Sequence, residues 1–264
     1  MYDFAYEKPG SLADAVKLLS ADADAKALAG GQTFIPVLKQ RLNRPSTVVD
    51  LAKLGLTGIT VSGDKVTIGA MTTHATIAGS PEIKAKIPGL QHQASLIGDE
   101  AVRHRGTIGG SLANNDPAAC YPSAVLALNG TIKTDRRSIP ADEFFQGMFT
   151  TALEPGEIIT SVELPVPQKS AYEKFRNPAS RYAIVGVFAA KFPSGVRLAI
   201  TGAGQGGVFR HAEFEKALSA HFAPEAIAGI ATPADGLNGD IHASPEYRAH
   251  LIGVVSKRAV AKAA

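Results

Sequence analysis

The sequence predicts an α+β chain whose main division falls near residue 167. Three observations lead to this prediction. Residues 1–56 alternate short apolar runs with helical patterns, as expected of a small β–α–β–α–β unit. Residues 59–68 alternate polar and apolar side chains around a central turn, which is typical of a β-hairpin. Residues 165–167, Pro-Val-Pro, resemble a linker, and residues 183–201 beyond them read as a second hairpin.

The opening unit has recognisable helix and strand signals. Ser11 stands at an N-cap position, and Asp14 is placed to reach back to it. Residues 26–28 form a short strand, and Pro36 suits the first turn of the helix that follows. Residues 47–51 are apolar enough to be a buried strand, which completes the unit.

Helical patterns dominate the next stretch of the chain. They are expected at residues 77–84, 89–97 and 122–128, and the last of these is closed by an Asn-Gly pair. Strands are expected at residues 131–133 and 157–164, before the linker.

The tail beyond the second hairpin is expected to be helical. Residues 224–230 form a short helix, and a longer helix begins at Ser244. The residues expected on the buried face of the long helix are Tyr247, Leu251, Val254 and Val255.

Composition narrows the class of protein. Of 264 residues, 45% are hydrophobic and 19% charged, as in an ordinary globular chain. The net charge of +3, without long runs of Lys or Arg, does not indicate nucleic-acid binding. The single cysteine, Cys120, excludes an internal disulfide and an iron–sulfur cluster held by this chain alone. With no apolar stretch of ~20 residues and no secretory signal, a chain without integral membrane segments in the reducing cytoplasm is expected.

A glycine turn after the first short strand is the first candidate site. Two adjacent glycines allow positive φ and close approach of a ligand, and successive backbone N–H groups before a helix bind anions. A pyrophosphate would suit this turn, although for one glycine pair on its own a tight strand–helix turn without a ligand is the favoured interpretation. The turn consists of Ala29, Gly30, Gly31, Gln32, Thr33 and Phe34.

A second glycine-rich segment lies at residues 105–117. Its glycines stand among Thr, Ser and Asn residues, which again places backbone donors and hydroxyls around one site. No Lys follows them as in a P-loop. Either turn alone is a weak signal, but the two together predict a ligand long enough to touch both, such as a dinucleotide.

Other motifs carry less weight. Residues 202–207 match G-x-G-x-x-G, but extended chain follows them instead of a helix, so a structural connection is preferred over a Rossmann site. The seven histidines show no metal-ligand spacing. Neither a nucleophile–base set nor a carboxylate pair is recognisable, so no metal site and no catalytic residue is predicted. This pattern fits an electron carrier better than a hydrolase.

At the two glycine segments the chain resembles the FAD-binding medium subunits of the molybdenum hydroxylase family, which includes aerobic carbon monoxide dehydrogenase and bacterial xanthine or nicotine dehydrogenases. The family patterns A-G-G-x-[ST] and R-G-T-I-G-G-[SN]-L-A stand here at residues 29–33 and 105–113. Further matching segments are residues 116–119, 157–165, 172–176, 182–187 and 247–248. The likeness therefore extends over nearly the whole chain.

This resemblance implies a fold of the vanillyl-alcohol-oxidase (PCMH) type. Residues 1–56 and 57–167 would be two FAD-binding subdomains. Residues 168–264 would be a C-terminal domain of the carbon monoxide dehydrogenase flavoprotein type, with a three-stranded antiparallel sheet and helices.

The resemblance also implies the FAD contacts, position by position. Ile97 would lie against the adenine, and Asn115 and Asp116 would approach the isoalloxazine or the ribityl chain. Ile159 and Lys174 match further FAD contacts, and Tyr182 matches an aromatic residue that covers one flavin face. The residues that would hold the pyrophosphate and the neighbouring chain are Ala29, Gly30, Gly31, Gln32, Thr33, Phe34, Thr107, Gly109, Gly110 and Ser111.

One position departs from the family pattern. Relatives carry an Asp for the FAD ribose where this chain has Cys120. A thiol is a weak donor and a poor acceptor, so the corresponding hydrogen bond is in doubt. A small buried cysteine packed beside the cofactor is favoured over a redox role.

Partners follow from the same resemblance. A large molybdopterin-binding subunit would oxidise the substrate, and a small iron–sulfur subunit would carry electrons to FAD in this chain. FAD would then reduce an external acceptor, in an assembly expected to be a dimer of heterotrimers. Two alternatives stay open: a stand-alone FAD-dependent oxidoreductase with its own substrate pocket, and a scaffold that has lost FAD.

Overall fold

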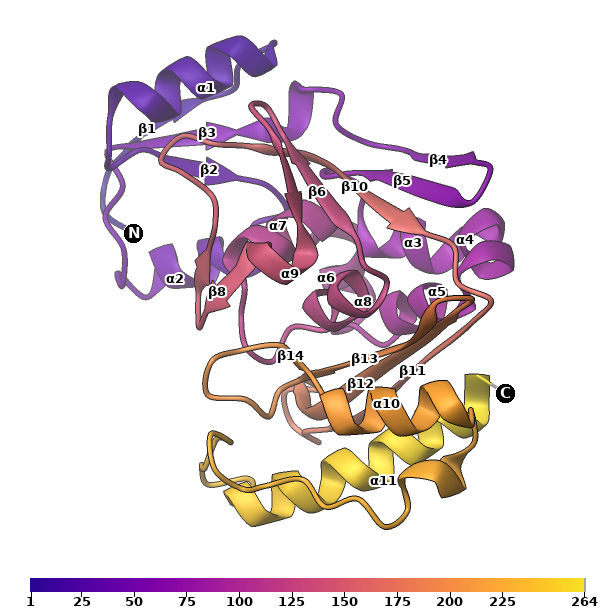
Figure 1. The fold of residues 1–264 in the computed structure, drawn as a ribbon. Helices are drawn as coiled ribbons and strands as arrows, with labels where there is room; N and C mark the ends of the chain where they lie inside the picture. The colour runs from indigo at the N-terminus through magenta and orange to yellow at the C-terminus, as the bar shows by residue number, and fades with distance from the viewer. Residues whose placement is uncertain (264) are drawn as a thin grey trace.

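The structure, a computed structural model, describes residues 1–263. Its elements form stacked layers, as Figure 1 shows: a small N-terminal unit at one side, an antiparallel sheet, a layer of helices, a second antiparallel sheet and two covering helices. No helix within the described part of the chain is both long and apolar enough to cross a bilayer.

The N-terminal unit is the predicted β–α–β–α–β arrangement. Its strands lie in the order β1-β3-β2 and are all parallel. Ser11 caps α1 as predicted, accepting a bond from the backbone N–H of Asp14 at 3.1 Å. The elements are β1 (Ala5–Glu7), α1 (Leu12–Ala21), β2 (Lys26–Leu28), α2 (Phe34–Lys39), β3 (Thr47–Asp50) and the 3₁₀ turn η1 (Leu51–Lys53).

The middle unit combines a five-stranded antiparallel sheet with seven helices, six of which lie between its second and third strands in chain order. The sheet order is β4-β5-β10-β6-β7, so the last strand to be made lies at the centre. Its strands are β4 (Ile59–Ser62), β5 (Lys65–Gly69), β6 (Thr131–Thr134), β7 (Ser138–Pro140) and β10 (Ile159–Pro165). A short helix, α9 (Ala141–Phe144), and a two-stranded hairpin, β8 (Phe145–Gly147) and β9 (Thr150–Thr151), stand between β7 and β10.

The helices of the middle unit are short. The single helix expected at residues 77–84 is two helices, because Ser80 ends one and caps the next. The helix that contains Gly109 and Gly110 was expected to be an open turn. The six helices are α3 (His74–Gly79), α4 (Pro81–Lys86), α5 (Pro88–Ser95), α6 (Glu100–Arg105), α7 (Ile108–Asn114) and α8 (Tyr121–Ala127).

The C-terminal sheet is antiparallel, as expected, but it has four strands instead of three. The fourth strand is two residues long and pairs with Ala199 and Ile200, which is too little for a sequence pattern to reveal. The predicted hairpin is confirmed, with Phe192 paired to Gly195 at its turn. The strands are β11 (Lys169–Arg176), β12 (Ala183–Phe192), β13 (Gly195–Thr201) and β14 (Phe209–Arg210).

Helices cover the outer face of this sheet. They are α10 (Ala212–Ala220), the 3₁₀ turn η2 (Pro224–Ile227) and α11 (Pro245–Ala263). The buried face of α11 contains Leu251 and Val255 as predicted, but Tyr247 is 43% exposed and Val254 only half-buried. Arg248 is buried instead, because its guanidinium bonds main-chain carbonyls of the sheet.

The central helices tie the two sheets together. Helix α8 contacts both β12 and β13, and α5 contacts β11. The largest cluster of buried apolar residues therefore runs from Val66 and Val162 in one sheet, through the helices, to Tyr172 and Phe188 in the other. This shared core fixes β11 and the start of β12 relative to the glycine segments.

Candidate functional site

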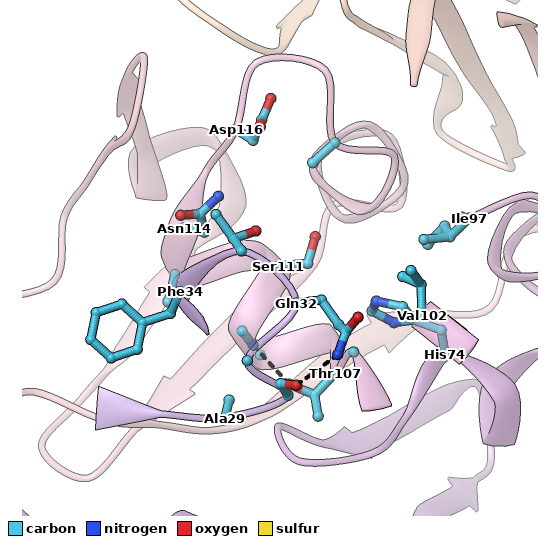
Figure 2. Close-up of a pocket in the computed structure, with 18 of the residues that line it drawn as sticks. Ala29, Gln32, Phe34, His74, Ile97, Val102, Thr107, Ser111, Asn114 and Asp116 are labelled. Atoms are coloured by element: carbon cyan, nitrogen blue, oxygen red, sulfur yellow. Dashed lines mark hydrogen bonds between the residues drawn. The ribbon is translucent and has the colours of Figure 1, made fainter. Parts of the chain in front are cut away.

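A cavity of about 640 Å³ opens between the N-terminal unit, the central helices and the edge of the C-terminal sheet. Figure 2 shows Gln32, His74, Thr107 and Ser111 close together among the residues that line it. Sixteen of the seventeen predicted FAD-contacting residues line this cavity, although they come from segments up to about 150 residues apart. They are Ala29, Gly30, Gly31, Gln32, Thr33, Phe34, Ile97, Thr107, Gly109, Gly110, Ser111, Asp116, Cys120, Ile159, Lys174 and Tyr182.

The first glycine turn connects β2 to α2 and presents unused backbone donors. Gly31 has a φ of 72°, which only glycine adopts readily. Among residues 1–263, no acceptor bonds the backbone N–H groups of residues 30–34, and the Thr33 hydroxyl makes no capping bond. A run of free N–H groups at the start of a helix is an anion-binding arrangement. This turn is therefore well suited to a pyrophosphate.

The second glycine segment plays a different part. Its backbone donors, expected to face a ligand, are used inside the protein: Gly109 N–H bonds Ala70 O at 2.8 Å, and Gly110 N–H bonds the Thr107 hydroxyl at 3.1 Å. The expectation that both segments offer main-chain donors is therefore wrong for these two residues. Their lack of a Cβ allows α7 to lie against Ala70 and Ala29. The segment thus shapes the cavity, while the Thr107 and Ser111 side chains line it.

The two glycine segments also contact each other. A Cβ on Gly30 would overlap the carbonyl oxygen of Arg105 and the Cα of Gly106. The turn at residues 30–34 is therefore seated directly on the chain that leads into α7. The absence of a side chain at Gly30 therefore allows the two glycine segments to pack against each other.

Lys174 organises one end of the cavity. Its ammonium donates to the carbonyl oxygens of Leu96 at 2.9 Å and Arg181 at 3.0 Å, and it contacts Cys120 Sγ at 3.5 Å. The residues that follow those two carbonyls, Ile97 and Tyr182, line the cavity. Ile97 was expected beside the adenine and Tyr182 over the flavin, but Lys174 holds the backbone next to both. Lys174 thus links the two segments of backbone that carry these side chains.

Asn115 is the one predicted contact that does not line the cavity. It has a φ of 43° and ends α7 in the left-handed conformation. Its side-chain amide donates to the carbonyl oxygens of Gly147 and Thr150, both at 2.8 Å, and so holds the β8–β9 hairpin. The preceding residue, Asn114, lines the cavity in its place. The sequence does not reveal which of these adjacent asparagines faces the cavity, because that depends on the residue at which α7 ends.

His74 is a cavity-lining residue that sequence reasoning missed. It is the first residue of α3, and its backbone N–H bonds Gly106 O at 2.9 Å. Burial, with repulsion by Arg103 as a smaller cause, lowers the pKa of His74 to about 4, so the ring is neutral near pH 7. Its ring lies 5.2 Å from that of Tyr121. A single histidine without metal-ligand spacing gives no sequence signal of such a position.

The charged groups of the lining leave a positive balance. Glu157 is paired with Arg137 at 3.0 Å, and these bonds lower the pKa of Glu157 to about 2. Asp116 accepts the backbone N–H of Ala118 at 2.8 Å. The charged residues in the lining are Lys26, Asp116, Glu157, Lys174 and Arg181. With Glu157 neutralised by its partner, the cavity favours an anionic ligand.

Aromatic and apolar groups accompany these charges. Tyr182 is 48% exposed at the cavity, and partial burial, followed by the charge of Asp116, raises the pKa of its hydroxyl. Ile97 and Ile159 add apolar surface. Free N–H groups for a pyrophosphate, together with an apolar and aromatic end for a ring system, match the parts of FAD.

Known proteins match this chain both in sequence and in structure. The family described as "FAD binding domain in molybdopterin dehydrogenase" matches residues 2–167. The chain is 38% identical to the nicotine 6-hydroxylase medium subunit of Paenarthrobacter nicotinovorans, covering 98% of this chain and 96% of that protein. It is 34% identical to the carbon monoxide dehydrogenase medium chain of Afipia carboxidovorans, with 98% and 96% covered.

The solved structures agree with the sequence comparisons. A chain of the reconstituted CO dehydrogenase from Oligotropha carboxidovorans superimposes with a TM-score of 0.90 at 33% identity, covering 99% of this chain and 98% of that chain. The match spans the C-terminal sheet and α11 as well as the glycine segments, so it includes the whole cavity. On this evidence the chain belongs to the family of FAD-binding domains of molybdopterin dehydrogenases.

Proposed function

We propose that this chain is the FAD-binding medium subunit of a molybdenum hydroxylase and transfers electrons from a partner's iron–sulfur clusters to an external acceptor. The observation that supports this most directly is the free N–H run of residues 30–34 inside a large, positively charged cavity. When bound, FAD supplies the two-electron redox chemistry. The chain's own residues bind and orient it.

Each part of the lining would have a distinct task. The turn at residues 30–34 would bind the pyrophosphate, with the Thr33 hydroxyl as a further donor. Thr107, Ser111 and Asn114 would contact the chain next to it. Ile97 would lie against the adenine, Tyr182 would cover one face of the isoalloxazine, and Lys174 would be a further contact. Residues 1–56 and 57–167 would act as the two halves of the FAD site, and residues 168–264 would close it.

The assembly is part of the proposal. Relatives are named medium subunits or medium chains, which implies companions of other sizes. We expect a large molybdopterin-binding subunit, a small iron–sulfur subunit and a dimer of such heterotrimers in the cytoplasm. Co-expression with the neighbouring reading frames, followed by light scattering of the purified complex, would give the composition and the mass.

The first experiment is an absorbance spectrum of the purified full chain, before and after incubation with FAD. We expect the bands of an oxidised flavin, with one FAD per chain. A colourless protein that also takes up no added FAD would contradict the proposal and favour a scaffold without cofactor.

A second experiment separates an electron-transfer subunit from a stand-alone flavoenzyme. The FAD-loaded chain, mixed without oxygen with candidate organic substrates, should keep its flavin oxidised. The same chain in its complex should become reduced when the complex oxidises its substrate. Rapid reduction of the isolated chain by an organic substrate would instead show that it has its own substrate pocket.

A further inference from the structure

The segment that leads into β10 joins the N-terminal unit to the middle unit beside the cavity. Ile158 is packed in the apolar cluster of the N-terminal unit, whereas its neighbour Ile159 belongs to the largest cluster, in the middle unit. Gly156 has a φ of 74°, and a Cβ there would overlap the Ser20 hydroxyl of α1. Glu157, Ile158 and Ile159 all line the cavity. This segment therefore helps to fix how the two units lie on either side of the cavity.

The Glu157 carboxylate is anchored by the end of β6 and the turn after it. The side chain is 0% exposed, so the part of this residue that lines the cavity is its main chain. The carboxylate accepts bonds from Nε and Nη2 of Arg137, both at 3.0 Å, from the Thr134 hydroxyl at 2.7 Å and from the backbone N–H of Glu154 at 2.8 Å. Paired Arg–carboxylate bonds impose a defined geometry. Glu157 thus cannot shift without breaking several bonds.

A second link from the same turn holds the next residue. The Asp135 carboxylate accepts the backbone N–H of Ile158 at 2.7 Å, and the Asp135 backbone N–H donates to the Ile158 carbonyl at 3.0 Å. Directly beyond this link, the pairing of β10 with β6 shifts register between Ile159 and Ser161. Such irregularities re-aim a strand and are common beside binding sites. The turn after β6 therefore controls the course of residues 157–159 along the cavity wall.

We propose that Glu157 is a positioning residue of the FAD site. Locked by Arg137, it holds residues 157–159 so that the turn at residues 30–34 stands at a fixed distance from the middle unit. The inference rests on the proposed function. A buried ion pair adds little net stability, because desolvation offsets its attraction, but its directional bonds define one arrangement. FAD would touch both units, so its affinity depends on their spacing.

The test is a fluorescence titration of the full chain with FAD, under conditions in which urea unfolding shows each variant to be folded. Glu157→Gln keeps the shape of the side chain but removes its charge and one acceptor oxygen. It is expected to raise the Kd for FAD about tenfold. The visible circular dichroism of the bound flavin should change as well, because the cofactor is held in an altered cavity. A loss of fold stability alone would change neither quantity in the folded protein.

Glu215→Gln is the matched control. Glu215 is also buried, accepts two bonds from Arg210 at 2.8 and 2.6 Å and accepts the backbone N–H of Leu198 at 2.8 Å. It belongs to α10, which lies outside the cavity lining. This variant should lose stability against urea to a similar extent and bind FAD with the Kd of the wild type.

An unchanged Kd in Glu157→Gln, or an equal rise of the Kd in both variants, would overturn the inference and leave the proposed function intact. If Glu157→Gln does not fold, Arg137→Lys compared with Arg210→Lys decides in the same way, because lysine cannot form the paired bonds. A wild-type chain that binds no FAD would instead refute the proposed function itself.

Discussion

At the scale of single residues, Gly30 has little freedom to change. An added Cβ would overlap the backbone of Arg105 and Gly106, so an alanine must push the turn at residues 30–34 away from α6. We expect Gly30→Ala to weaken FAD binding at least tenfold and to lower the free energy of unfolding by roughly 1–3 kcal/mol. Flavin fluorescence titration and urea unfolding would measure these changes.

Gly79→Ala is the control for that substitution. Gly79 is in α3, and a Cβ there meets no atom within 4 Å. This variant should bind FAD like the wild type and be as stable or slightly more stable, since alanine favours a helix. Wild-type FAD binding by Gly30→Ala would show that the close contact between the two glycine segments is not required.

The lowered pKa of His74 predicts that the free energy of unfolding depends on pH between 6.5 and 4. Its folded pKa, about 4, is below the ordinary value of 6.5, so the unfolded chain takes up a proton first as the pH falls. The stability that the neutral ring contributes is complete above pH 6.5 and is lost as the pH drops towards 4. The loss amounts to up to about 3 kcal/mol at 1.36 kcal/mol per pKa unit.

A comparison with His74→Gln isolates this effect. The variant should lose most of the change in unfolding free energy between pH 6.5 and 4, measured by urea titration at several pH values. Glu157 does not interfere, because its pKa of about 2 places its own loss of stability below about pH 4.5. If the unfolding free energies of wild type and variant change with pH in parallel, the pH dependence does not come from His74.

At the scale of elements, the two glycine segments show what sequence patterns can predict. Both were recognised as parts of one ligand site, and both line one cavity. Their different use of backbone donors was not predictable, because Ala70, the acceptor for Gly109, is 39 residues away. Glycine spacing indicates that the backbone is approached closely by another group of atoms. It does not reveal whether that partner is a ligand or another segment of the chain.

Helix α11 contains a buried charged residue that its sequence pattern does not predict. The apolar spacing placed Leu251 and Val255 correctly, but it gave no reason to bury Arg248. The guanidinium bonds the carbonyl oxygens of Ile184 at 2.6 Å and Gly202 at 3.0 Å, near the start of β12 and just after β13. Such a role depends on two strand ends that meet only in the folded sheet.

This arrangement predicts a large effect of Arg248→Ala. Removing the side chain leaves two buried carbonyls without donors, and we expect a loss of roughly 3–5 kcal/mol in the free energy of unfolding. Asp240→Asn is the milder control, because the Asp240 side chain is 45% exposed where it pairs with Arg248. Urea unfolding of both variants would measure the difference. Equal stabilities would mean that the helix is held by its apolar face alone.

At the scale of the whole molecule, ligand binding and stability are linked. The cavity is built from the N-terminal unit, the central helices and β11, so bound FAD would connect all three. At an FAD concentration 100 times the Kd, we expect the free energy of unfolding to rise by about 2.7 kcal/mol. Thermal unfolding at increasing FAD should follow this relation, and Gly30→Ala should need a higher concentration for the same gain. A melting temperature independent of FAD would contradict the proposed site.

The order of strands has a consequence for synthesis on the ribosome. Strands β5 and β6 emerge with their hairpin partners, β4 and β7, but each keeps one open edge until β10 leaves the exit tunnel. Open strand edges invite pairing with other chains. A nascent chain that has passed β9 but not β10 is thus at its most vulnerable, and helper chaperones would be needed most at that moment. Translation stalled there should leave the first 150 residues sensitive to protease, whereas release of the full chain should protect them.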